Sequence, residues 1–288
     1  MTSYFSIVYQ ITQECPFNCD ICLRRYEPNE KPLTPAMRRK MVDILKDAKI
    51  GRLNVTGGEP TILGNELYEF LMYVHKKQIH TCLTTTGFRL SQEKLEHMDR
   101  YLDQIMIPFH SGNQTDWQKM YSNKQFAAGL FDTALNILDW AKSTSIIVEV
   151  NTVAHQKNMN EIIDIGWRLL RINPKITWRI DEYYGMGIKE KEKHRFELGS
   201  GEFENICTQI AKTFDGLFNN LKFTSVKQRK NSPEFLITHT GELVTSSNHR
   251  HDPTDFNLLH TPLPSEFRML RSWAEFKKVC RDWGWEDI

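Results

Sequence analysis

Residues 4–22 read YFSIVYQITQECPFNCDIC, a run of aromatic and β-branched residues that leads into three closely spaced cysteines. Aromatic and β-branched residues favour a β-strand, which we expect over residues 4–12. The cysteines that follow are Cys15, Cys19 and Cys22, in the spacing C-x3-C-x2-C. This stretch therefore predicts a strand whose carboxyl end carries a loop of potential metal ligands.

Strand-like and helix-like patterns alternate downstream of this loop. Further strands are expected near residues 53–55, 79–85, 104–109, 146–153 and 176–180. Helices are expected between them, and the first begins after the capping pair Thr34 and Pro35. Such a series of β–α repeats implies a parallel sheet with helices outside it. The predicted fold class is α/β, a partial (β/α)6 TIM-like barrel with a small C-terminal extension.

The β–α pattern weakens after Asp181. We therefore expect residues 1–181 to form the barrel core and residues 182–288 to form an extension packed on it. The extension is expected to contain a helix, a β-hairpin and a terminal amphipathic helix, near residues 203–214, 235–246 and 265–283. In a barrel of this kind the chemistry lies at the carboxyl ends of the strands, where the cysteine loop also lies.

The overall composition is that of an ordinary folded protein, with 40% hydrophobic and 25% charged residues and a net charge of +1. Such a charge gives no general attraction to nucleic acid or to a membrane. No apolar stretch of about 18 residues is present, so no membrane span is expected. The first residues lack the pattern of a signal peptide, and a cytoplasmic location is expected.

Three thiolates on one loop can bind three irons of a [4Fe–4S] cluster and leave the fourth iron open, because such clusters normally take four cysteines. A zinc site with a fourth ligand from elsewhere, or three buried cysteines without metal, is the alternative. Zinc sites favour paired C-x2-C or Cys/His sets, and no second cysteine pair occurs. The loop alone favours a cluster and leaves zinc open.

A second motif, Gly57-Gly58-Glu59-Pro60, follows the second expected strand. Glycines let a ligand approach the backbone closely. A carboxylate beside them could bind an ammonium group of that ligand. A simple turn is the alternative for the Gly-Gly pair.

Together, the two motifs resemble those of the radical S-adenosylmethionine (SAM) superfamily, in which they follow the first and second strands. The resemblance covers most of residues 4–181 and implies two cofactors, a [4Fe–4S] cluster and SAM. It implies that the three cysteines are the metal ligands and the catalytic centre, and that residues 57–60 bind SAM. The implied reaction is reductive cleavage of SAM to a 5′-deoxyadenosyl radical that abstracts hydrogen from the substrate.

The same resemblance implies further SAM contacts at the ends of later strands. Thr86 stands where many relatives carry Asn, and His110 stands where many carry Asp. Asn151 matches a polar position near the SAM ribose, and Met186 lies in a glycine-flanked loop where the backbone often meets the adenine. A structural histidine at the rim is the alternative for His110, and a plain loop is the alternative around Met186.

Several basic residues could line the mouth of the barrel and hold a phosphate or carboxylate. The candidates for substrate binding are Arg24, Arg179, Lys227 and Arg229. Short segments, including the one around Trp178 and Arg179, resemble viperin-like nucleotide-modifying members of the superfamily. The expected function is a radical SAM enzyme that acts on a small or anionic substrate such as a nucleotide. Scattered surface cations are the alternative reading of the basic residues.

Two other functions stay open. The C-terminal hairpin resembles that of SPASM or twitch-type members, which modify peptides, and so radical modification or activation of a peptide or protein is the alternative. Ser246 and Ser247 stand where an auxiliary-cluster cysteine could be, which predicts a single cluster. A non-catalytic zinc-binding barrel is the third possibility. The resemblance implies a flavodoxin or ferredoxin-type electron donor, and no membrane or nucleic-acid partner is expected.

Overall fold

The computed structural model describes residues 6–22, 31–47, 50–121, 127, 129–185, 193–231, 235–241 and 243–245. Its strands are β1 (Ser6–Thr12), β2 (Arg52–Gly57), β3 (His80–Thr84), β4 (Gln104–Pro108), β5 (Ile147–Ala154), β6 (Thr177–Glu182), β7 (Asn220–Thr224), β8 (Phe235–Ile237) and β9 (Leu243–Thr245). They form one nine-stranded sheet in the order β7-β6-β5-β4-β3-β2-β1-β8-β9. All neighbours from β7 to β8 are parallel, and β9 runs antiparallel to β8.

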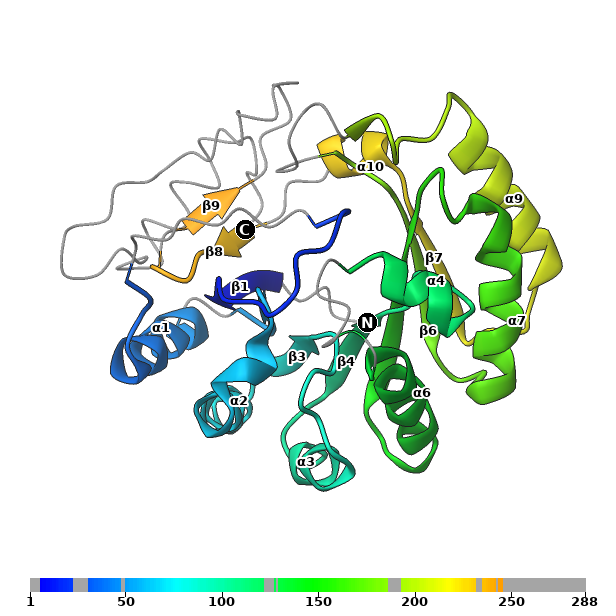
Figure 1. Cartoon of the computed structure of the whole chain (residues 1–288). Coiled ribbons are helices and arrows are strands. Elements are labelled where there is room, and N and C mark those ends of the chain that lie inside the picture. The colour runs from blue at the N-terminus through cyan, green and yellow to red at the C-terminus, as the bar shows by residue number, and fades with distance from the viewer. Residues whose placement is uncertain are drawn as a thin grey trace.

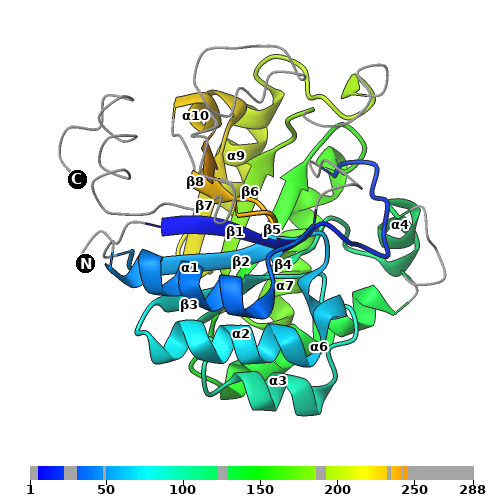
Figure 2. The ribbon, with the colours of Figure 1, turned by 90° about the vertical axis from the view of Figure 1, so that its left-hand side faces the viewer.

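Helices cover the convex face of this curved sheet (Figure 1). The α-helices are α1 (Pro35–Asp47), α2 (Asn65–Lys76), α3 (Gln92–Met98), α4 (Gln114–Lys119), α6 (Leu130–Trp140), α7 (Ile162–Ile172), α9 (Glu202–Thr213) and α10 (Val226–Asn231). Three short 3-10 helices are η1 (Pro60–Leu63), η2 (Ala141–Ser143) and η3 (Met159–Glu161). Figure 2 shows α1, α2 and α3 lying side by side along the strands. No described helix is long and apolar enough to cross a bilayer.

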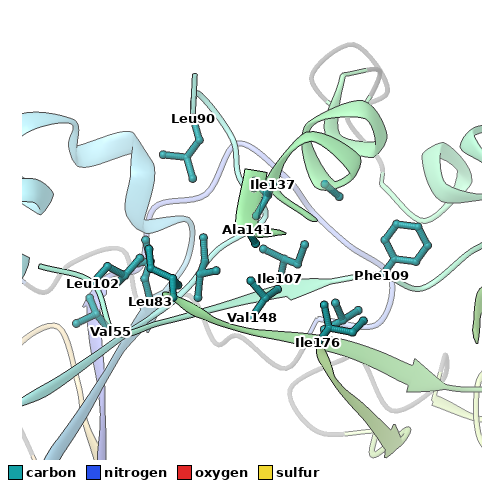
Figure 3. Packing of buried hydrophobic residues seen from close by; sticks show 14 of the residues in the cluster. Val55, Leu83, Leu90, Leu102, Ile107, Phe109, Ile137, Ala141, Val148 and Ile176 are labelled. Carbon is teal, nitrogen blue, oxygen red and sulfur yellow. The ribbon is translucent and has the colours of Figure 1, made fainter. Parts of the chain in front are cut away.

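The alternation of side chains along the strands divides the sheet into an apolar and a polar face. One set of positions, including Val55, Leu83, Ile107 and Val148, is buried beneath the helices (Figure 3). The intervening positions carry polar side chains, such as Asn54 in β2, which accepts a hydrogen bond of 2.9 Å from the Thr84 hydroxyl in β3. Successive residues of a strand point to opposite faces, so the polar set lines the concave side.

The predicted α/β fold with a parallel, open sheet is confirmed, and all six expected strands are present. The helix and hairpin expected in the C-terminal part are also found, as α9, β8 and β9. Among the α-helices and strands of the described residues, three were missed: α4, β7 and α10. Each has only five or six residues and many polar ones, so none shows a recognisable apolar period. The helix expected over residues 265–283 lies outside the described residues.

The C-terminal part joins both edges of the sheet. β7 pairs with β6, where Arg179 lies opposite Lys222. β8 pairs with β1 at the other edge, where Val8 lies opposite Leu236. Residues beyond 181 therefore extend the parallel sheet itself, and β7 brings a new set of polar side chains to its concave face.

Candidate functional site

The cysteine loop follows β1 and is held across the rim of the sheet. Cys19 forms an antiparallel bridge with Tyr121, and the Asp20 N–H donates to the Met120 carbonyl at 3.4 Å. Within the loop, the Cys22 N–H donates to the Cys19 carbonyl at 3.2 Å. All three cysteines are intermediate in burial. The chain segment after α4 thus fixes a loop that carries three accessible thiols.

The glycine motif after β2 docks on the start of this loop. The Gly58 N–H donates to the Thr12 carbonyl at 2.7 Å, and the Glu59 N–H donates to the Glu14 carbonyl at 2.8 Å. Gly57 has a φ of +143°, which residues with a side chain rarely adopt. A Cβ on Gly58 would lie 2.0 Å from the Glu14 carbonyl oxygen. The close approach of the two backbones therefore requires both glycines.

Glu59 is fully buried, and its carboxylate is already used within the chain. One oxygen accepts from the Thr61 N–H at 3.1 Å, the Thr61 hydroxyl at 2.8 Å and the Thr85 hydroxyl at 2.5 Å. The other accepts from the Thr86 N–H at 2.8 Å and the Thr86 hydroxyl at 2.6 Å. A carboxylate offers about four acceptor sites, so these five donors saturate it. Glu59 thereby ties the end of β2 to the end of β3, and it positions Thr86.

Two histidines lie at the ends of β4 and β5. His110 Nδ1 accepts from the Val153 N–H at 3.1 Å, and its ring stacks on Trp117 with centroids 6.4 Å apart. His155 Nδ1 accepts a hydrogen bond from the Lys157 N–H at 3.2 Å. This histidine was not predicted as a site residue, although it directly follows β5. Burial lowers the pKa of His110 to about 4 and that of His155 to about 3. Both rings are therefore neutral, with the proton on Nε2.

The two histidines line a cavity of about 220 Å³ beside the cysteine loop. Its apolar walls are Ile21, Met120 and Phe196, and Ile21 and Phe196 pack together in a small cluster. His155 Nε2 is buried and has no hydrogen-bond partner in the described part of the chain. The cavity therefore offers an N–H donor and an apolar wall to a bound group.

These histidines should make the stability depend on pH. Their pKa values lie near 6.5 when unfolded, so below that pH the unfolded chain binds more protons than the folded one. Stability is then complete above about pH 6.5 and declines as the pH falls toward 4 for His110 and 3 for His155. At about pH 5 the combined loss should be about 2 to 4 kcal/mol in urea unfolding. His155→Gln should make the free energy of unfolding less dependent on pH. The matched control is His75→Gln, at a side chain 47% exposed, and it should keep the dependence of the wild type. An equal dependence on pH in both variants would show that His155 is not its cause.

Of the remaining predicted residues, Asn151 and Arg179 lie side by side on the concave face. Asn151 donates from Nδ2 to Asp181 at 2.6 Å, and Arg179 pairs with the buried Glu149. Lys227 is exposed on α10. Arg24, Met186 and the side chain of Arg229 lie outside the described residues. Lys222 also forms an ion pair with Glu149, at 2.9 Å. It was not predicted as a site residue because β7, the strand that carries it, was not predicted.

No group of three or more His, Cys, Asp or Glu side chains among the described residues is arranged to hold a single metal ion. The rim carries a loop with three thiols and a glycine pair packed on the start of that loop. The cavity beside them holds two neutral histidines, and its lining also includes charged residues: Asp20, Asp116, Lys119, Lys157 and Glu161. A family model described as the radical SAM superfamily matches residues 9–165. The chain belongs to the radical SAM superfamily. Members of this superfamily use a [4Fe–4S] cluster and SAM, the two cofactors expected from the sequence.

Among curated proteins, the chain is similar to PqqA peptide cyclase of Bradyrhizobium diazoefficiens, with 23% identity over 65% of this chain and 49% of the relative. It is 23% identical to the SAM-dependent nucleotide dehydratase RSAD2 of Oncorhynchus mykiss, over 61% of this chain and 50% of the relative. It is 27% identical to GTP 3′,8-cyclase of Aquifex aeolicus, over 62% of this chain and 56% of the relative. The chain thus spans about half the length of these relatives.

Among solved structures, Streptococcus suis SuiB bound to SAM has a TM-score of 0.67 at 13% identity, covering 83% of this chain and 59% of SuiB. Native anSMEcpe with bound SAM and the Kp18Cys peptide has the same TM-score and identity, covering 83% of this chain and 73% of that chain. Both likenesses confirm the open parallel α/β fold.

Proposed function

We propose that this chain is a radical SAM enzyme whose cluster is held by Cys15, Cys19 and Cys22. The observation that carries the proposal is the cysteine loop, which backbone contacts at Gly58 and Tyr121 fix across the rim of the sheet. The sequence holds no second C-x2-C pair of the kind that zinc sites favour, which favours a cluster with an open iron over zinc. When bound, the cluster supplies the electron that cleaves SAM to the 5′-deoxyadenosyl radical, which takes a hydrogen atom from the substrate.

The residues around the loop are proposed to bind SAM. Gly57 and Gly58 pack the end of β2 against Thr12 and Glu14, beside the cysteine loop, and Glu59 holds Thr86 at the end of β3. His110 closes the end of β4 as a neutral ring. Pro60, Asn151 and Met186 complete the proposed SAM-binding residues.

The proposed substrate is a small or anionic molecule such as a nucleotide. Support comes from the cations on the concave face and from similarity to proteins named for GTP and nucleotide chemistry. Arg24, Arg179, Lys227 and Arg229 remain the proposed substrate contacts from the sequence. Similarity to PqqA peptide cyclase favours a second candidate, the modification of a peptide. A flavodoxin or ferredoxin-type electron donor and a cytoplasmic location belong to the same proposal.

Anaerobic reconstitution with iron and sulfide tests the proposal. We expect about four irons per chain, visible absorption from an iron–sulfur cluster, and 5′-deoxyadenosine after addition of SAM and dithionite. Cys15→Ser should lose the cluster, because the loop would keep only two thiolates. Cys207→Ala, on α9, is the matched control and should keep it. Stoichiometric zinc without iron uptake by the wild-type chain would overturn the proposal.

A further inference from the structure

The concave face carries a continuous chain of polar contacts from β2 to β7. Arg52 donates from Nη2 to Gln104 Oε1 at 3.0 Å, and Gln104 donates from Nε2 to Glu149 Oε2 at 3.2 Å. The same carboxylate pairs with Lys222 Nζ at 2.9 Å and with Arg179 Nε at 2.6 Å. Five strands therefore contribute to one network below the rim that holds the cysteine loop.

Glu149 is buried, whereas its two cationic partners are not. The Glu149 side chain is 1% exposed, while that of Arg179 is 27% and that of Lys222 is 39% exposed. A buried carboxylate is stable only when it is paired, which explains the two ion pairs. Arg179 contacts Glu149 through Nε without the alignment of a hydrogen bond. Its terminal guanidinium nitrogens make no hydrogen bond within the described residues and can bind a further anion.

Positive charge exceeds negative charge in this network. Its described strand positions on the concave face carry three cations, Arg52, Arg179 and Lys222. They carry two carboxylates, Glu149 and Asp181. Asp181 already accepts a hydrogen bond from Asn151 Nδ2 at 2.6 Å. One cation is thus left without a carboxylate in the described part of the concave face. A partly exposed cation without a carboxylate partner is available to an anionic ligand group, with which it would form a charge-assisted hydrogen bond.

The depth of the network limits the kind of molecule that reaches both it and the rim. Arg179 precedes Glu182, the last residue of β6, by three positions, which is about 10 Å along the strand. A substrate whose reacting carbon lies at the rim would place its anionic group about that far away. A sugar or nucleoside carrying phosphate has this length, and phosphate suits both the planar fork of Arg and the point charge of Lys.

We propose that Arg179, Lys222 and Arg52 bind a phosphate group of a small phosphorylated substrate, and that Glu149 positions the first two. The proposal rests on the radical SAM function for the role of this ligand. Arg52 and Lys222 are thereby added to the residues proposed to contact the substrate. Arg179, already a candidate from the sequence, is held in place by its ion pair with Glu149.

Titration calorimetry on the reconstituted protein with SAM tests this site directly. The probes are inorganic pyrophosphate and two matched pairs, UTP with uridine and glucose 6-phosphate with glucose. Pyrophosphate should bind, and UTP or glucose 6-phosphate should bind at least about tenfold more tightly than its unphosphorylated partner. The pair that shows the larger difference in affinity between its phosphorylated and unphosphorylated members distinguishes a nucleotide from a sugar phosphate. The failure of pyrophosphate and both phosphorylated probes to bind would overturn the proposal.

Variants assign the binding to the network. Lys222→Met should weaken pyrophosphate binding by about tenfold, and Lys222→Arg should restore most of it, because the charge returns. Lys142→Met is the matched control, since Lys142 is a surface cation paired with Asp139, and it should bind as the wild type does. Equal affinity in a folded Lys222→Met would refute the site. If Lys222→Met does not fold, the wild-type comparison of phosphorylated and unphosphorylated probes still decides.

The two proposals fail separately. Formation of 5′-deoxyadenosine by the wild-type chain without substrate tests the radical SAM function, and pyrophosphate binding does not depend on it. If the protein binds pyrophosphate but does not cleave SAM, the proposed phosphate site stands and the proposed enzymatic function is wrong. A chain that cleaves SAM but binds no phosphorylated probe would keep the function and lose this inference.

Discussion

Gly58→Ala is expected to displace the cysteine loop and to cost the reconstituted protein most of its iron. The new Cβ would lie 2.0 Å from the Glu14 carbonyl oxygen, 2.5 Å from the Glu14 carbonyl carbon and 2.7 Å from the Gln13 carbonyl oxygen. All three atoms belong to the backbone, so no side-chain rotation relieves the overlap. The two strand ends must separate, which breaks the bond of 2.8 Å from Glu59 N–H to Glu14. Glu14 directly precedes Cys15, so the first proposed ligand moves with it.

The effect of Gly58→Ala should be visible in stability as well as in iron content. Overpacking typically costs about 1–3 kcal/mol, and backbone overlap should place this variant at or above that range in urea unfolding. Gly129→Ala is the matched control, because a Cβ there meets nothing within 4 Å and the φ of −93° suits alanine. The control should lie within about 0.5 kcal/mol of the wild type. A Gly58→Ala protein as stable and as rich in iron as the control would show that the close approach is dispensable.

Much of the fold was predictable because its inner strands repeat one pattern. Each predicted strand contributes apolar side chains that pack under a helix, as Leu53, Ile105 and Trp178 do. β7 was missed for a physical reason, since it is an edge strand of mixed polarity in which no residue is fully buried. Its pairing with β6 depends on a neighbour about 40 residues earlier in the chain, which no local pattern records.

The candidate site was predictable where chemistry is local and was missed where it depends on tertiary contacts. The cysteine spacing and the Gly57-Gly58 pair stand in continuous stretches of sequence. Two of the three residues that bond to the Glu59 carboxylate, Thr85 and Thr86, lie 26 and 27 residues further along the chain. Glu149 likewise meets Lys222 from 73 residues away. The sequence therefore identified Glu59, Thr86 and Arg179 as functional candidates. It did not predict that Thr86 bonds to Glu59 or that Glu149 pairs with Arg179.

The second large effect is expected for Glu59→Gln, even in the absence of any cofactor. Both carboxylate oxygens only accept hydrogen bonds, and an amide replaces one of them by an NH2 donor. On the Oε2 side that donor would face the Thr86 N–H, which cannot turn away as a hydroxyl can. On the Oε1 side it would face the Thr61 N–H in the same way. Either orientation leaves a backbone donor unpaired, a buried one at Thr61 or a partly buried one at Thr86, so the variant should lose about 1–3 kcal/mol in urea unfolding.

Glu96→Gln makes the same substitution at an exposed position of α3, where the carboxylate accepts a single bond from Gln92 at 2.9 Å. It should change stability by less than about 0.5 kcal/mol. The pair of variants also separates two roles for Glu59. If this carboxylate served chiefly to bind the ammonium group of SAM, Glu59→Gln would unfold like the wild type without SAM and lose only SAM affinity. The five donors gathered on Glu59 instead predict that stability falls first, because the ends of β2 and β3 separate when their shared acceptor is lost.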